Sequence, residues 1–370
     1  MNRSAAFALM GFFVCTFPAY AQRTGDAVPP LKPRPATPAD PLLAPEESPC
    51  LANVRQLTSP AIGLQKAGEA YFAPDGRRII FQAVPAGNVE YQIYTLDLKD
   101  EGIAKPESLR MVSTGAGACT CSFFRPDGKR ILFASSHLDP RLQQSPRPKE
   151  DEAYRSERGY RWDFNEWMEI FEADPDGDHR TRLTDVRGYD AECAYSPDAR
   201  QIVFASNRTG DVEVYLMNAD GSSPLQITRA KGYDGGPFFS PDGTRIVYRS
   251  DRRGDGNMQI FTNNLAGTDE VRLTDNDVLN WCPFWHPSGR YVIFTEGRHN
   301  GPPRYDLYLL PVDPQKALAP DGRFRVTHHP RFDGLPVFSP DGRRVMWTSK
   351  RGPDDTSQVF LADFTAPSGY

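Results

Sequence analysis

The sequence predicts an all-β fold: a six-bladed β-propeller closed by an N-terminal strand in the last blade. Three observations carry this prediction: a turn motif that occurs six times, strand-like segments that follow each turn, and a lone strand before the first repeat. The motif is clearest at Ser240-Pro241-Asp242-Gly243, and the prolines of its six copies are Pro74, Pro126, Pro197, Pro241, Pro287 and Pro340. The two shortest intervals, 44 and 46 residues, match the length of one four-stranded blade.

Each turn is predicted to join the first two strands of a blade. Proline presets the backbone for the first corner of the turn, aspartate bonds nearby backbone N–H groups, and glycine takes the left-handed position. The residues that follow are β-branched and aromatic, as in Ile202-Val203-Phe204 and Ile246-Val247-Tyr248, and such runs are typical of strands.

Two further strands complete each unit. The third contains a polar-aliphatic-aromatic triplet, as in Glu213-Val214-Tyr215, and the fourth ends in a shared threonine such as Thr228. The last unit has no fourth strand before Tyr370, whereas Arg55-Gln56-Leu57-Thr58 precedes the first repeat. A closed ring explains both facts, because the N-terminal strand then completes the last blade and removes the exposed sheet edge.

The chain resembles the TolB-like family of propeller repeats. The resemblance rests on the Ser-Pro-Asp-Gly turn and the Leu-Thr outer strand, and it covers roughly residues 54 to 364. It implies a propeller that binds other proteins of the cell envelope. The α/β domain that precedes the propeller in that family has no counterpart here, where a proline-rich stretch stands instead.

The N-terminal residues predict export. Arg3, the apolar run of residues 5–18 and the Ala19-Tyr20-Ala21 site are typical of a secretory signal cleaved after Ala21. The expected domain plan is a signal peptide at 1–21, a proline-rich linker at 22–53 and the propeller at 54–370. We therefore expect a periplasmic or secreted protein with no membrane span.

The bulk composition excludes some partners. The formal net charge is −5, and acidic and basic residues are interspersed, so no basic stripe suits nucleic acid. A monomer is expected. After signal removal the cysteines are Cys50, Cys119, Cys121, Cys193 and Cys282; their odd number leaves at least one unpaired within the chain, and their pairing cannot be derived from the sequence.

The repeats also predict a ligand-binding face. We call the end of the ring with the Pro-Asp-Gly turns the lower face and the opposite end the upper face. In four repeats, an acid or amide seven residues before the proline accompanies an arginine eleven residues after it: Asp190 with Arg208, Asp234 with Arg252, Asn280 with Arg298 and Asp333 with Arg351. These pairs either link two loops of one blade, which the correlation favours, or hold a polar ligand at the channel mouth.

Two further features belong to the same face. Glu192, with the neighbouring acids, could offer oxygens to Ca²⁺ in the channel mouth, so calcium is a possible ligand although no cofactor is expected. The longest insertion, residues 138–165, carries Trp162, which either anchors a partner or packs the insertion onto its blade.

The sequence favours a non-catalytic role over an enzyme. It has no Gly-x-Ser-x-Gly, His-Glu-x-x-His or phosphate-loop motif. We expect the upper face to bind a protein, peptide or envelope glycan. The alternative is a metal-assisted lyase or hydrolase acting on a carbohydrate or lactone, with ligands among His137, His299, His328 and His329.

Overall fold

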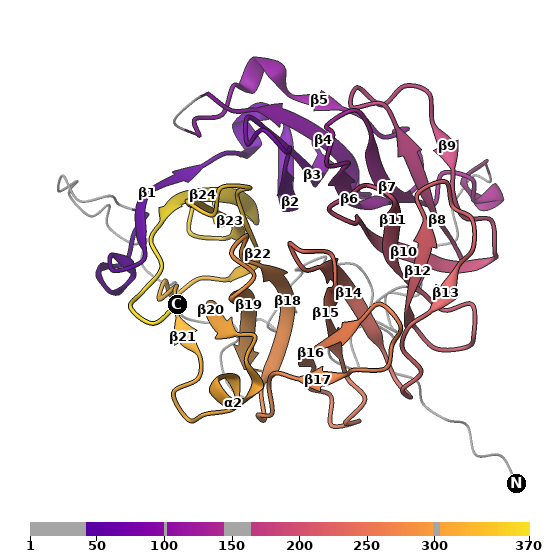
Figure 1. Cartoon of the computed structure of the whole chain (residues 1–370). Coiled ribbons are helices and arrows are strands. Elements are labelled where there is room, and N and C mark those ends of the chain that lie inside the picture. The colour runs from indigo at the N-terminus through magenta and orange to yellow at the C-terminus, as the bar shows by residue number, and fades with distance from the viewer. Residues whose placement is uncertain (1–41, 100–101, 144–163, 299–303) are drawn as a thin grey trace, which may run out of the picture.

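The strands are arranged in sheets around a central axis, as the prediction of an all-β propeller requires (Figure 1). The computed structural model describes residues 42–99, 102–143, 164–298 and 304–370. Strands β2, β6, β10, β14, β18 and β22 lie innermost, next to the axis, and each contains the residues just before one repeat proline (Figure 1).

Four sheets have four strands each. The first contains β2 (Leu64–Phe72), β3 (Arg78–Pro85), β4 (Gln92–Asp97) and β5 (Arg110–Met111). The others contain β14 (Asp234–Phe239), β15 (Arg245–Ser250), β16 (Gln259–Asn264) and β17 (Val271–Arg272); β18 (Leu279–Trp285), β19 (Tyr291–Arg298), β20 (Arg304–Pro311) and β21 (Phe324–Arg325); and β22 (Asp333–Phe338), β23 (Arg344–Ser349), β24 (Gln358–Phe364) and β1 (Leu51–Gln56).

The second and third repeats form one eight-stranded sheet. The second supplies β6 (Cys119–Phe124), β7 (Ile131–Ser135), β8 (Trp167–Ala173) and β9 (Thr181–Arg182), and the third supplies β10 (Gly188–Tyr195), β11 (Gln201–Ser206), β12 (Glu213–Asn218) and β13 (Leu225–Gln226). A short parallel pairing of Trp167 with Gly188 joins β8 to β10. Every other strand pair is antiparallel in the described part of the chain.

Short helices lie in the connections. They are η1 (Pro45–Glu47), η2 (Pro60–Ile62), η3 (Pro106–Ser108), η4 (Pro140–Gln143) and α2 (Pro314–Ala317). No helix in the described ranges is long and apolar enough to cross a membrane.

The repeated turn folds as its residues predict. In the fourth repeat, the Ser240 hydroxyl donates to the Asp242 carboxylate over 2.6 Å, and Gly243 N–H donates to the Ser240 carbonyl over 2.8 Å. Gly243 has a φ of 71°, the left-handed conformation that glycine adopts without steric cost.

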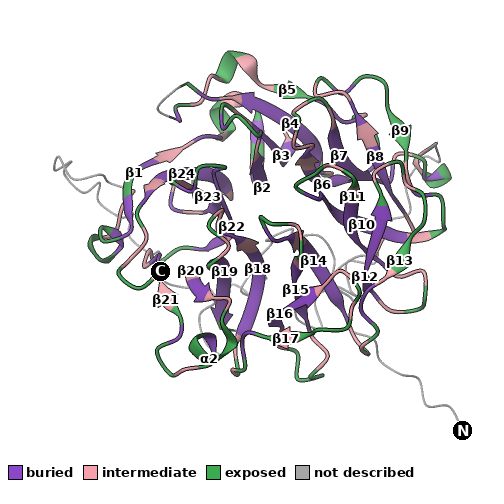
Figure 2. Ribbon diagram, in the orientation of Figure 1, coloured by how far each residue is buried: buried purple, intermediate pink, exposed green. Residues whose placement is uncertain are grey.

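The aromatic residues of the second and third strands form one ring pair in every repeat. The pairs are Phe81–Tyr94, Phe133–Phe171, Phe204–Tyr215, Tyr248–Phe261, Phe294–Tyr308 and Trp347–Phe360, with centroids 5.7–6.2 Å apart. The second-strand member is at most 1% exposed in all six. Buried surface therefore follows the inner strands, while exposed residues lie at the outer edges and loops (Figure 2).

The N-terminal end of the folded part differs from the expected boundary. Residues 42–53 were assigned to the linker, yet β1 begins at Leu51, and the side chains of Leu51 and Glu47 are almost fully buried. Strand β1 pairs antiparallel with β24, with Leu51 opposite Phe364 (Figure 1). The residues from 42 onward therefore pack as part of the folded unit.

Candidate binding face and central channel

One position of each repeat lines the central channel. Five residues before the repeat proline, each inner strand carries a bulge where the pairing register shifts. The residue at that position has a φ of 47–60° in all six repeats: Glu69, Cys121, Glu192, Gly236, Cys282 and Leu335. All six border one cavity on the axis, so the bulges turn these side chains toward the channel.

Glu192 is held in this channel by a compact polar network. Its carboxylate accepts from the Tyr233 hydroxyl at 2.8 Å, from Gly236 N–H at 2.5 Å and from Arg249 Nη2 at 3.0 Å. Arg249 comes from β15, and its guanidinium fills the space that a side chain at Gly236 would occupy. The network therefore depends on glycine at position 236, where a larger residue would clash with the Arg249 guanidinium.

Glu69 lies in the same channel, and no ion pair with an arginine is found for it in the described part of the chain. Burial raises the pKa of its carboxyl to about 7, and the charge of Glu192 adds to the rise. The Tyr71 hydroxyl donates to it over 3.4 Å. The cavity leaves about 40 Å³ for the centres of water-sized molecules, which suits a few waters but not a sugar or a peptide.

Three of the four predicted upper-face pairs form. Arg208 Nη2 lies 3.0 Å from Asp190, Arg252 Nη2 lies 2.9 Å from Asp234, and Arg351 Nη2 lies 2.6 Å from Asp333. The arginines also stack on the buried ring pairs: their guanidinium carbons lie 5.2 Å from the centroid of Phe204, 4.4 Å from that of Phe261 and 5.0 Å from that of Trp347, respectively. This geometry fits the interpretation of an ion pair that links two loops of one blade.

The fourth pair does not form. Asn280 donates to the Met258 carbonyl, to Gln259 and to Asn276, all at 2.7–3.2 Å, while Arg298 is exposed at the end of β19. An amide has no net charge to hold a guanidinium across the loop, and neighbouring amides satisfy it instead. The prediction of an Asn280–Arg298 pair was therefore wrong.

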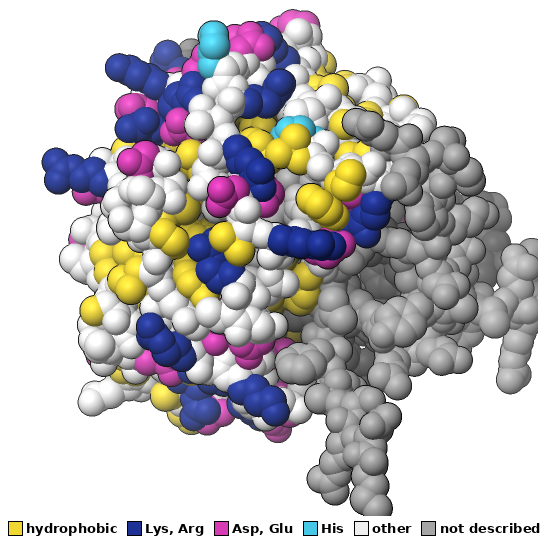
Figure 3. All heavy atoms as spheres, turned by 90° about the vertical axis from the view of Figure 1, so that its right-hand side faces the viewer, with side chains coloured by type: hydrophobic (Ala, Val, Ile, Leu, Met, Phe, Trp, Pro, Cys, Tyr) yellow, Lys and Arg dark blue, Asp and Glu magenta, His cyan; other side chains and the backbone are white. Residues whose placement is uncertain are grey.

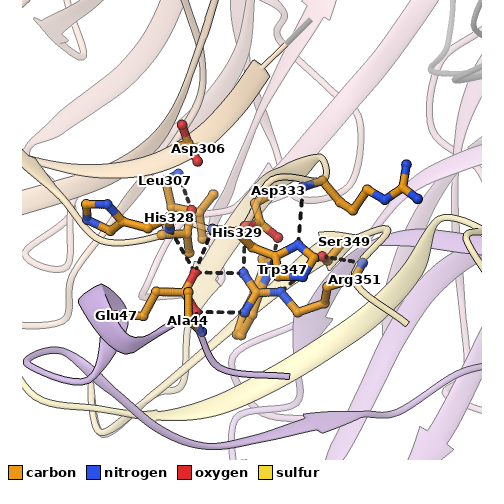
Figure 4. A network of polar contacts seen from close by, with 12 residues as sticks. Ala44, Glu47, Asp306, Leu307, His328, His329, Asp333, Trp347, Ser349 and Arg351 are labelled. Atoms are coloured by element: carbon orange, nitrogen blue, oxygen red, sulfur yellow. Dashed lines mark hydrogen bonds and ion pairs between the residues drawn. The ribbon is translucent and has the colours of Figure 1, made fainter. Parts of the chain in front are cut away.

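Arg351 is fully enclosed by the N-terminal segment. Glu47 of η1 accepts from Arg351 Nη1 at 3.0 Å and Nη2 at 3.1 Å, and it also accepts from the backbone N–H groups of His328 and His329 (Figure 4). Asp333 holds the other side of the guanidinium and accepts from Trp347 Nε1 at 2.9 Å. Arg351 and Asp333 are thus closed to an external ligand.

Of the histidines proposed as metal ligands, His137 and His329 make different local side-chain contacts, and His328 meets Glu47 through its backbone N–H. His137 Nδ1 lies 2.8 Å from the Ser135 hydroxyl, and the His137 ring packs on Phe171. The side-chain Nδ1 of His329 accepts from Arg331 N–H, and burial, followed by the charge of Arg351, lowers the pKa of His329. His299 lies outside the described residues.

No metal-binding group of three His, Cys, Asp or Glu side chains occurs in the described ranges. The acids considered as calcium ligands are already paired with arginines. Asp190, Asp234 and Asp333 each face the arginine of their own repeat, and Glu192 faces Arg249. The five cysteines that the structure describes are all buried and form no disulfide with one another.

An exposed cluster lies where the second repeat meets the third, and we call it the rim cluster: Arg141, Glu166, Trp167 and Arg187. Arg187 lies over the Trp167 ring, 5.3 Å from its centroid, and its Nη2 lies 2.7 Å from Glu166. Arg141 approaches the same glutamate within 3.8 Å. The side chains of Arg187 and Arg141 are 67% and 48% exposed, so this cluster is accessible to a partner.

The aromatic residues of the long insertion divide between two roles. Trp162 lies outside the described residues. Phe164 packs its ring 4.9 Å from Tyr189 and 6.1 Å from Tyr233, so it anchors the end of the insertion over the channel. Trp167, by contrast, remains partly exposed in the rim cluster.

Sequence reasoning missed Glu47, Arg249 and Arg187. Glu47 lies in a segment assigned to the linker, and nothing local marks a contact across some 300 residues. Arg249 had a usable signal, because Gly236 is the glycine at a channel position where other repeats carry a side chain. No sequence signal marks Arg187, because its place beside Trp167 depends on the parallel pairing of β8 with β10, which only the structure shows.

Comparisons with known proteins agree with the repeat architecture. Residues 165–308 match the family model described as the TolB beta propeller domain. The chain carries a TolB-like β-propeller. The Tol-Pal system protein TolB of Anaeromyxobacter sp. (strain K) is 31% identical over 109 residues, and the same holds for that of Anaeromyxobacter dehalogenans. The match covers 29% of this chain and 23% of either relative, so it spans about a quarter of their length.

Solved structures with the same fold include proteins of different kinds. TolB from Acinetobacter baumannii has a TM-score of 0.55 and 18% identity, over 79% of this chain and 65% of that one. Oligogalacturonate lyase from Vibrio parahaemolyticus has a TM-score of 0.51 and 16% identity, over 82% and 78%. At these identities the likeness shows the TolB-like propeller fold and does not choose between binding and catalysis.

Proposed function

We propose that this TolB-like propeller is a non-catalytic binding protein of the cell envelope that captures a protein or peptide on its upper face. The observation that carries the proposal is the rim cluster, where Arg187 lies over the partly exposed ring of Trp167. Val186, which precedes Arg187, and Leu138, three residues before Arg141, are also exposed. Tryptophan and arginine dominate the binding energy of protein interfaces.

The side of the ring that carries β9 and β13 has a mixed surface. Viewed from the side of β9 and β13, acidic and basic side chains are interspersed, and apolar ones form small separate areas (Figure 3). The channel has room for a few waters only, and its strongest charges already satisfy one another. A partner would therefore meet its main contacts on the loops at the rim.

We also propose the finer plan of the molecule. Six units around one axis, with β1 as the outer strand beside β24, support a six-bladed ring closed by the N-terminal strand. The eight-stranded sheet counts as two blades in this plan, because among the described residues its halves are joined only by the short pairing of Trp167 and Met168 with Gly188 and Tyr189. The signal at 1–21 and a linker that ends near residue 41 support export to the periplasm, with the propeller acting as a monomer.

Partner capture tests the function. The purified chain from Gln22 onward is immobilised and exposed to an envelope extract, and the captured proteins are identified and quantified. Trp167→Ala combined with Arg187→Ala should reduce the specific partner at least tenfold, because both anchors of the rim are lost. Arg200→Ala, at a lower-face turn where the side chain is 85% exposed, is the matched control and should leave capture unchanged. Equal capture by the rim variant and the control would overturn the proposal.

A catalytic role would give a different result. A metal-assisted lyase predicts one transition-metal ion for each chain in elemental analysis and a loss of turnover in His137→Ala or His328→Ala. Stoichiometric metal together with cleavage of an oligosaccharide by the wild-type chain would replace the binding proposal.

A further inference from the structure

We propose that Arg208, together with the backbone N–H groups of Asp185 and Val186, binds a carboxylate supplied by an acidic side chain of the partner. We call this the Arg208 site. The inference rests on the proposed binding function and names the chemistry that the upper face recognises. It comes from a comparison of three repeats that share one Asp–Arg pair but differ in what meets the free side of the guanidinium.

The last repeat shows the site when it is filled. Arg351 binds Asp333 on one side and the Glu47 carboxylate on the other, and Glu47 also accepts from the N–H groups of His328 and His329. Glu47 comes from a segment remote in sequence, so it behaves as an internal ligand. Its bonds define the template: a guanidinium and two successive loop N–H groups around one carboxylate.

The third repeat has the same framework. Six residues separate the outer-strand threonine from the aspartate in both repeats, Thr184 to Asp190 and Thr327 to Asp333, so Asp185 and Val186 correspond to His328 and His329. Arg208 keeps the further contacts of its counterpart: it donates to the Ser206 hydroxyl at 2.8 Å, as Arg351 does to Ser349 at 3.3 Å. Among the described residues, only the second carboxylate is missing.

In the fourth repeat, an acid that directly precedes the outer strand meets the Nη1 of the arginine. Arg252 binds Asp234 through Nη2, and its Nη1 donates to Glu270 at 2.6 Å. Glu270 lies four residues before Thr274, and the corresponding residue of the third repeat is Pro224, four before Thr228. Proline has no acid to offer, which explains why the third repeat lacks an internal partner.

The free donors of the Arg208 site are accessible. Arg208 uses Nη2 for Asp190 and Nε for Ser206, whereas its Nη1 has no hydrogen-bond partner in the described ranges; the side chain is 14% exposed, against 0% for Arg351. Asp185, Val186 and Arg187 are exposed, and no hydrogen bond from the N–H of Asp185 or Val186 is found among the described residues.

The charges around the site favour a carboxylate placed on the loop. Asp190 already neutralises one side of Arg208, while Arg187 of the rim cluster follows directly after Val186. The Asp185 side chain is exposed and opposes an incoming acid weakly, because solvent screens it. An acidic residue with an apolar neighbour would suit Arg208 and the exposed Val186.

The internal ligand supplies the probe for the experiment. A synthetic peptide with the sequence of residues 42–49 and blocked ends is titrated into the full mature chain by calorimetry, beside a peptide in which glutamine replaces both glutamates. We expect the acidic peptide to bind at least tenfold more tightly than the amide peptide. Free glutarate forms the second arm: equal binding of glutarate and peptide would assign the site to small solutes, while the carboxylate chemistry would stand.

Two variants separate the site from folding defects. Arg208→Met should abolish binding but also leaves Asp190 unpaired in the interior, so its stability needs checking. Pro224→Glu keeps the Asp190–Arg208 pair and installs the counterpart of Glu270, and it should lower peptide affinity at least tenfold without loss of thermal stability. Arg252→Met is the matched control and should leave the affinity unchanged. Binding that survives both Arg208→Met and Pro224→Glu, or no binding to the wild-type chain, would overturn the inference.

The outcome remains separate from that of the proposed function. If partner capture depends on Trp167 and Arg187 but not on Arg208, the binding function stands and the Arg208 site fails. If the peptide binds at Arg208 while no envelope protein is captured, the carboxylate site stands and the proposed partner class fails.

Discussion

Glu213 and Asp234 face each other across the boundary between the third and fourth repeats, and neither is more than 3% exposed. Two other boundaries place acids in the same way, but there the first acid meets an arginine of the outer strand: Glu169 meets Arg182 at 2.6 Å, and Asp306 meets Arg325 at 2.8 Å. The corresponding residue beside Glu213 is Gln226.

The missing arginine leaves this acid pair to share a proton. The Thr228 hydroxyl donates to Glu213 at 2.6 Å, and Arg252 pairs with Asp234 Oδ2, whereas Asp234 Oδ1 has no other hydrogen-bond donor in the described ranges. Burial raises the pKa of Glu213 to about 8, and the charges of Asp234 and Asp211 add to the rise. A carboxyl with a raised pKa stabilises the fold while protonated, so this contribution is complete below the usual carboxyl pKa of about 4.5 and is lost progressively as the pH rises to about 8.

Glu213→Gln should therefore make the protein more stable at alkaline pH. The amide can donate to Asp234 as the protonated acid does, but it cannot ionise. We expect the melting temperature at pH 8.5 to rise by roughly 2–4 °C, with little change at pH 5.5, as measured by calorimetry across that range. Glu169→Gln is the control: it leaves Arg182 without its carboxylate, so it should give no gain at pH 8.5. A parallel response of the two variants would contradict the shared-proton interpretation.

At the scale of elements, η1 fastens the N-terminal segment to the last sheet through one buried ion pair. Burial alone would raise the pKa of Glu47, but the charge of Arg351 lowers it, so the pair stays ionised at neutral pH. Its contribution is lost on acidification through the pKa of the carboxyl. Removing one member of a buried pair leaves an uncompensated charge, which costs about 3 kcal/mol or more.

Glu47→Ala should accordingly lower the free energy of unfolding by about 3 kcal/mol. It should also speed hydrogen exchange at the N–H groups of residues 328 and 329, whose acceptor is lost. Urea denaturation and exchange measured by mass spectrometry check the two effects. Glu46→Ala changes the neighbouring exposed glutamate and should alter neither quantity by a measurable amount. Equal stabilities of the two variants would show that η1 is not fastened by this pair.

The elements that the sequence predicts well are those built from contacts within one repeat. The turn residues and the Asp190–Arg208 pair join residues at most 18 positions apart, and the Asp–Arg pair recurs at that spacing in three repeats. Contacts between different repeats or with the N-terminal segment leave no such signal. Glu47 meets Arg351 from 304 residues away, and Arg249 enters the channel only because Gly236 leaves room.

At the scale of the whole molecule, the proposed ring closure assigns the N-terminal strand a defined energetic role. Strand β1 covers the edge of β24, and Leu51, Val54 and Leu57 bury their side chains to 6% exposure or less. Each such side chain contributes about 1.5–3 kcal/mol on burial. Without β1, the chain would lose these contacts and expose a strand edge that invites pairing with other chains.

Three versions of the chain test this closure. A chain that begins at Leu42 should melt at the same temperature as the chain that begins at Gln22, because it keeps η1 and β1. A chain that begins at Ser59 should melt at least 10 °C lower or form oligomers by size-exclusion chromatography with light scattering, because β24 becomes an edge. A permuted chain that begins at Ser59 and carries residues 42–58 after Tyr370 through a Gly-Ser linker restores the same strand order. It should recover the monomer and the melting temperature, since closure depends on where β1 pairs and not on which terminus supplies it. If the chain that begins at Ser59 is monomeric and as stable as the other two, β1 is an accessory strand and the ring is held by its inner contacts alone.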